Sequence, residues 1–143
     1  MNELEIIKAI ENLVEYNISP KINIMLGTCP EEKPEDIAYS LKKLKQLPVE
    51  NVMFSIATPF KGSQFYQFCQ QKGYLIDESD EINPFGKAMI SFPNLSNRDL
   101  EFYERHAYRS FYLRPSIIWR RISSYKNIRN LLNDIKIAIK LLK

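Results

Sequence analysis

Few side chains in this sequence are of types that could do chemistry. Cys29 and Cys69 lie 40 positions apart, too far for a CxxC pair or a metal-ligand cluster. His106 is the single histidine, and no histidine near Cys29 in the sequence could activate that thiol as a nucleophile. Glu31 and Glu32 could form an acid pair, but carboxylates just before a helix favour its positive N-terminus. We therefore predict no catalytic residue and no metal ligand.

The size and composition are those of one globular domain. The chain has 143 residues, with 45% hydrophobic and 26% charged residues. It is too short for a complete eight-fold βα barrel, which takes about 250 residues. It has no apolar run of the roughly 18 residues that span a membrane, and its start is acidic and polar, unlike a secretory signal. We expect a cytoplasmic protein with both thiols reduced.

Two strand–turn–helix units are expected to position the candidate binding site. Residues 21–27 and 51–57 are strand-like apolar runs that end at Gly/Pro turns, and helices are predicted over 34–46 and 63–72. Repeated units of this kind favour a parallel α/β sheet, with ligands at the carboxyl ends of its strands. The first strand is apolar along most of its length, which suggests that both of its faces are covered.

Further helices flank these units. Residues 3–16 carry an apolar stripe, and the helix over 63–72 should turn Phe65, Phe68 and Cys69 inward. Residues 74–76 and 88–92 could be short extended pieces. Ser96 and Asp99 resemble a capping box at the start of a helix to about 113. Two more helices are predicted over 115–122 and 126–142.

The charge divides the chain into two parts. Residues 98–143 carry 11 Lys and Arg against 4 Asp and Glu, whereas residues 1–97 carry 9 against 13. In the basic part, arginines alternate with aromatic residues. This mixture can bind RNA through phosphates and bases, can lie on an anionic membrane, or can form a helical cap whose aromatics are packed and whose arginines stay hydrated. Nucleic acid is the least favoured of these partners.

Three segments together resemble a known family. They are residues 25–33 (MLGTCPEEK), residues 55–66 (SIATPFKGSQFY) and residues 108–121 (YRSFYLRPSIIWRR). The first two resemble the last two strand ends of a radical S-adenosylmethionine barrel. The third is similar to the segment after the barrel in the subgroup with a cobalamin-binding domain. The first turn is one residue longer than the family pattern and lacks its second glycine.

The resemblance implies a partial βα barrel with two or three mainly parallel strands over residues 1–95 and a helical C-terminal extension over 96–143. It implies that Leu26 and Gly27 in the first turn, with Ala57, Thr58 and Pro59 in the second, contact S-adenosylmethionine through backbone and apolar atoms. A glycine at a strand end allows such close approach. The full-length enzymes use this cofactor with a [4Fe–4S] cluster, and the subgroup also uses cobalamin.

One departure from the family decides what this chain can do alone. The cluster motif Cys-x-x-x-Cys-x-x-Cys is absent, and two cysteines cannot replace its three thiolates. We therefore expect a C-terminal piece of such an enzyme, inactive and without bound cofactor by itself.

The expected partner is the remainder of the barrel. Open strand edges could also pair two copies of the chain. Contact with a membrane surface or a lipophilic substrate is a further expectation for its partners. The alternative function is a stand-alone binding module that uses its basic, aromatic helices on RNA or on an anionic membrane surface.

Overall fold

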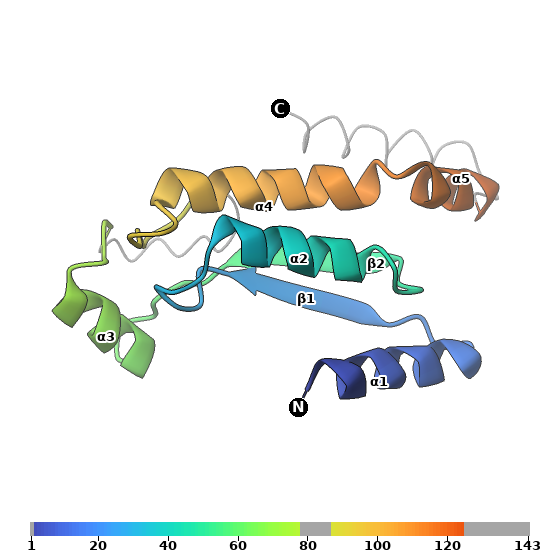
Figure 1. Ribbon diagram of the computed structural model, residues 1–143, viewed down its shortest axis with the longest axis horizontal. Helices are drawn as coiled ribbons and strands as arrows, with labels where there is room; N and C mark the ends of the chain where they lie inside the picture. The colour runs from blue at the N-terminus through green and yellow to red at the C-terminus, as the bar shows by residue number, and fades with distance from the viewer. Residues whose placement is uncertain (1, 78–86, 125–143) are drawn as a thin grey trace.

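The computed structural model describes residues 2–77 and 87–124, with seven helices and strands in that part of the chain (Figure 1). Their bounds match the sequence predictions to within about two residues. The predicted helix over 126–142 lies outside the described residues. The elements are α1 (Glu3–Glu15), β1 (Lys21–Leu26), α2 (Pro34–Leu44), β2 (Asn51–Ile56), α3 (Gln64–Lys72), α4 (Asn97–Tyr112) and α5 (Pro115–Ser124).

The fold is mixed α/β with a two-stranded parallel sheet. β1 and β2 pair in register from Lys21 opposite Asn51 to Leu26 opposite Ile56, and α2 forms the crossover between them. The prediction of parallel strand–turn–helix units is therefore confirmed. Of the other predicted extended pieces, Leu75 and Ile90 form only an isolated antiparallel bridge. The two strands of the described residues do not by themselves close a barrel.

One face of this sheet carries the core. Alternate strand residues point to opposite faces, and on the core face Leu26, Phe54 and Ile56 are each exposed by 2% or less. The opposite face of β1 carries Lys21, Asn23 and Met25, and all three are exposed. The expectation that both faces of the first strand are covered is thus wrong for the part of the chain described here. The apolar residues of β1 do not all mark buried positions, because Met25 is apolar but 57% exposed.

α4 closes the outer edge of β2 with two tyrosine hydroxyls. The Tyr108 hydroxyl donates to the carbonyl of Phe54 at 2.9 Å and accepts from its N–H at 3.2 Å. The Tyr112 hydroxyl does the same at Val52, at 2.6 and 2.9 Å. Tyrosines one helical turn apart thus satisfy strand residues two apart, and they take the place of a next strand.

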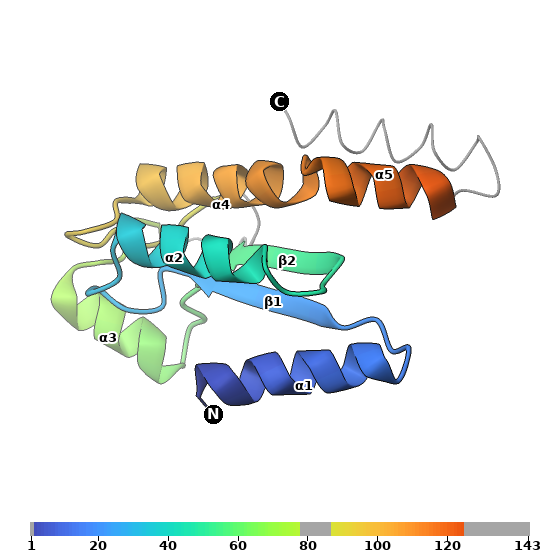
Figure 2. The ribbon, with the colours of Figure 1, turned by 45° about the vertical axis from the view of Figure 1, so that its right-hand side comes forward.

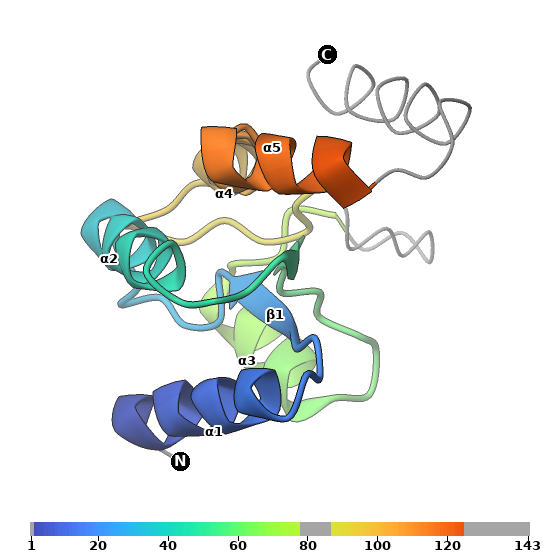
Figure 3. The same ribbon diagram turned by 90° about the vertical axis from the view of Figure 1, so that its right-hand side faces the viewer.

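α1 and α4 lie on opposite sides of β1, as the turned views show (Figures 2 and 3). α1 is joined to α2 by a 3.0 Å salt bridge from Lys43 to Glu3 and by the Tyr39 hydroxyl at 3.3 Å from Glu3. Of the predicted apolar stripe on α1, only Ile10 is buried; the other three members, Ile6, Leu13 and Val14, are 36–41% exposed.

A single core joins the predicted segments 1–95 and 96–143. Buried residues of α4 and α5 pack in it with buried residues of β1, β2 and α2. Within α3, Cys69 is buried and Phe65 packs against the core, but Phe68 is 38% exposed. The inward orientation predicted for Phe68 is therefore wrong, because the short helix presents a narrow buried stripe centred on Cys69.

Candidate functional site

The ends of β1 and β2 bring the five predicted site residues to one edge of the sheet. The N–H of Ala57 donates to the carbonyl of Leu26 at 2.8 Å, so the two turns leave the sheet side by side. Leu26, Gly27, Ala57 and Pro59 are buried, and Thr58 is half-buried. The Leu26 side chain faces the core, and its carbonyl is bonded to Ala57. Contact of these residues with a cofactor stays a prediction.

The first turn is held by a carboxylate from within the same loop. Oε2 of Glu32 accepts from the N–H of Gly27 at 2.7 Å and from that of Thr28 at 3.1 Å. Gly27 has a φ of +73°, a conformation that favours glycine. α2 begins only at Pro34, so Glu32 acts on the turn rather than as part of the helix N-terminus. A side chain of the right length thus fixes the end of β1.

Replacing Glu32 with alanine is expected to lower the free energy of unfolding by about 1.5–3 kcal/mol, because two backbone N–H groups lose a charged acceptor. Glu31→Ala is the matched control, since Glu31 is exposed and should change stability by less than about 0.5 kcal/mol. Urea denaturation of both variants measures the difference. Equal effects of the two changes would show that Glu32 does not hold the turn.

The second turn leads directly into α3. The Thr58 hydroxyl donates to the carbonyl of Ile56 at 3.2 Å, and the Ser63 side chain caps α3 by accepting from the N–H of Tyr66 at 3.1 Å. Phe60 is 52% exposed next to these groups. This turn therefore presents backbone and apolar surface, and no acid–base pair.

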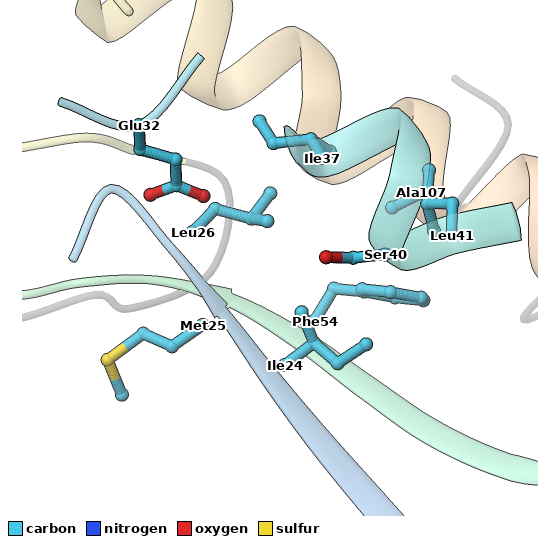
Figure 4. A pocket seen from close by; sticks show the side chains of 9 residues that line it. All are labelled: Ile24, Met25, Leu26, Glu32, Ile37, Ser40, Leu41, Phe54 and Ala107. Atoms are coloured by element: carbon cyan, nitrogen blue, oxygen red, sulfur yellow. The ribbon is translucent and has the colours of Figure 1, made fainter. Parts of the chain in front are cut away.

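α4 and the segment that precedes it cover the first turn from the core side. A side-chain carbon at Gly27 would lie 3.1 Å from Cδ1 and Cδ2 of Leu100 and 3.4 Å from Cδ1 of Ile90. Below this cover, a cavity of about 50 Å³ lies between the strands, α2 and α4 (Figure 4). Leu26 and Phe54 line it on one side, and Ile37 and Leu41 on the other. Its volume suits a water molecule or two, not a nucleoside. The Met25 side chain points away from Ile37 and Leu41, on the other side of the strand, in Figure 4.

The remaining candidates do not assemble with these turns into a catalytic group. Cys29 is an exposed free thiol, and Cys69 is a buried one whose pKa is raised by burial. His106 is exposed and stacks on Phe102, with ring centres 5.9 Å apart. In residues 2–77 and 87–124, no three His, Cys, Asp or Glu side chains are grouped so that they could hold a metal ion.

Several aromatics of the basic segment serve the fold. Tyr108, Phe111 and Tyr112 pack on or bond to β2. The Arg114 guanidinium lies 4.2 Å from the centre of the Phe111 ring and donates to the carbonyl of Lys45 at 2.9 Å. Trp119 is 74% exposed, and the other aromatic and basic residues of the tail beyond it lie outside the described side chains. The described helices include none that is long and apolar enough to cross a membrane.

Comparison with known proteins gives one relative. The chain is 22% identical over 116 residues to an uncharacterized methyltransferase of Pyrococcus horikoshii, a match that covers 81% of this chain and 25% of that protein. The chain is similar to part of a methyltransferase. It spans about a quarter of that relative's length. No protein-family model and no solved structure matches.

Two functional features were missed from the sequence alone. The sequence position of Glu32 predicts a carboxylate at a helix N-terminus, but its distance of five residues from Gly27 also allows a return to the turn. The tyrosines at 108 and 112 were read only as aromatics of a cap. Their spacing of four residues was the available signal, since it places two hydroxyls on one helix face.

Proposed function

We propose that this chain forms the last βα units and the closing helices of a radical S-adenosylmethionine enzyme. Within that enzyme, the ends of β1 and β2 form one wall of the S-adenosylmethionine site. The observation that carries the proposal is the pair of parallel strand ends joined by the Ala57–Leu26 hydrogen bond of 2.8 Å, above a sheet face that carries exposed Met25. The resemblance of the two turns and the methyltransferase relative support it.

The residues fit one of the implied groups better than the others. Leu26, Gly27, Ala57, Thr58 and Pro59 offer backbone and apolar atoms to the methionine and adenine parts of S-adenosylmethionine, which supplies an electrophilic methyl group or a 5′-deoxyadenosyl radical when bound. The two thiols do not fit a [4Fe–4S] cluster, because one is exposed, one is buried and three thiolates are needed. The cluster and any cobalamin therefore belong to another portion of the enzyme.

The test uses the chain with a complementary fragment. The probe is the part of the Pyrococcus methyltransferase that lies outside the 116 matched residues. We expect a mixture of the two to retain S-adenosylmethionine in equilibrium dialysis, and neither component to retain it alone. After anaerobic addition of iron and sulfide, the 143-residue chain alone should show no cluster absorbance and release no 5′-deoxyadenosine.

A pair of variants at Met25 makes this test specific. Met25→Trp fills the exposed sheet face and should weaken retention roughly tenfold or more, whereas Met25→Leu should leave it unchanged. Because Met25 is 57% exposed, neither change should unfold the chain. A mixture without retention, retention that Met25→Trp does not affect, or a cluster on the chain alone would each refute the proposal.

A further inference from the structure

The two outer edges of the sheet differ in their hydrogen bonds to the other described residues. The outer edge of β2 is satisfied at Val52 and Phe54 by the tyrosines of α4. In β1, the Leu26 carbonyl is directed to β2, so by alternation Asn23 and Met25 direct their backbone groups outward. No hydrogen bond from the described residues reaches those outward groups. Among residues 2–77 and 87–124, hydrogen bonds therefore satisfy the outer edge of β2 but not the outer edge of β1.

The helix before β1 stands where the crossover of a further parallel unit would stand. α2 joins β1 to β2, and α1 precedes β1 in the same order, through residues 16–20. α1 also lies beside α2, through the Glu3–Lys43 salt bridge of 3.0 Å. A helix in this position normally connects two neighbouring parallel strands. The strand that would pair with β1 from that side is not among the described elements.

The surface of α1 carries the apolar residues that such a neighbour would cover. Ile6 is 41% exposed and Leu13 is 38% exposed, and their spacing of seven residues places them on one flank of the helix. Their neighbour Ile10, at 5% exposure, already belongs to the core. The exposed flank is thus continuous with an interface that exists.

We propose that the open edge of β1 and the Ile6–Leu13 flank of α1 together dock a parallel β-strand and its helix from the complementary portion of the enzyme. This inference rests on the proposed function for the identity of the partner. A second copy, paired about a two-fold axis, would set β1 antiparallel to itself, whereas α1 is placed for a parallel neighbour. The methyltransferase relative, of which the match covers a quarter, has chain enough to supply the strand.

The test mixes the 143-residue chain with the same part of the Pyrococcus methyltransferase, the part outside the matched residues. Size-exclusion chromatography with light scattering should give a one-to-one complex. Amide hydrogen exchange at Asn23 and Met25 should slow by about tenfold or more in the complex, because these N–H groups acquire strand partners. Exchange at Phe54 should change little, since its N–H is already bonded to Tyr108.

Two variants at one position separate edge pairing from side-chain contact. Asn23→Pro removes an outward N–H without touching the β1–β2 ladder, a position where proline is tolerated, and should abolish the complex. Asn23→Thr keeps the N–H and should preserve it. Circular dichroism and urea denaturation of each variant confirm that the chain is folded. Leu13→Glu on α1 provides a second test that does not alter β1. It should weaken the complex even if proline at position 23 disturbs the strand.

The outcomes separate this inference from the proposed function. Absence of a complex, protection at amides other than Asn23 and Met25, or a chain that dimerises through those amides would overturn the docking surface. A complex with slowed exchange that retains no S-adenosylmethionine would leave the docking surface standing and refute the proposed function. Retention of S-adenosylmethionine without slowed exchange in β1 would support the proposed function and refute the docking surface.

Discussion

Replacing Phe111 with alanine is expected to lower the free energy of unfolding by about 3–5 kcal/mol, the largest effect of any single change considered. The Phe111 ring is fully buried, with its centre 6.3 Å from that of Phe54 and 4.2 Å from the Arg114 guanidinium. Its removal leaves a cavity between α4 and β2, at the point where α4 seals the sheet. Urea denaturation followed by circular dichroism measures the loss.

Phe102 on the same helix provides the control. It is 56% exposed, so Phe102→Ala should cost less than about 1 kcal/mol. A loss at Phe111 no larger than the loss at Phe102 would mean that α4 does not pack on β2 as described.

Replacing both Tyr108 and Tyr112 with phenylalanine is expected to unseal the edge of β2. Each hydroxyl satisfies one N–H and one carbonyl of the strand, so each single change should cost about 1–3 kcal/mol, and the double variant more. The exposed edge should also promote association of the chain. Denaturation and light scattering measure the two effects.

Tyr103→Phe is the matched control for this pair. Tyr103 packs against the core from the same helix, and its hydroxyl makes no hydrogen bond to a described residue. The free energy of unfolding of the Tyr103→Phe variant should therefore stay within about 0.5 kcal/mol of that of the parent. A double variant as stable and as monomeric as this control would show that the hydroxyls do not seal the edge.

The Tyr108 hydroxyl gives the chain a dependence on alkaline pH. Burial raises the pKa of Tyr108 above its ordinary value, so the folded state favours the neutral hydroxyl. This contribution is fully present below the unfolded pKa of about 10 and is lost as the pH rises through the folded value. Tyr108→Phe should lack that part of the alkaline loss of stability.

The local elements follow from the sequence because their signals are local. Pro34 at the start of α2, the Ser96–Asp99 capping box of α4 and Gly73 with a φ of +69° at the end of α3 each act within one turn of helix. Apolar runs that end at Gly/Pro turns, followed by helical periodicity, then identify β1 and β2 as strands of parallel units. The partial resemblance to radical S-adenosylmethionine enzymes rests on the same short segments.

The tertiary structure decided which surfaces those elements bury. Exposure of Met25, Phe68 and Leu13 depends on which elements lie opposite them, and residue type carries no information about that. The bonds from Tyr108 to Phe54 and from Glu32 to Gly27 likewise depend on distances that form only when the chain folds back. Sequence by itself determined the strands, their turns and the five candidate residues. Only the folded chain distinguished a sealed edge at β2 from an open edge at β1, because hydrogen bonds across a sheet join residues that are far apart in the sequence.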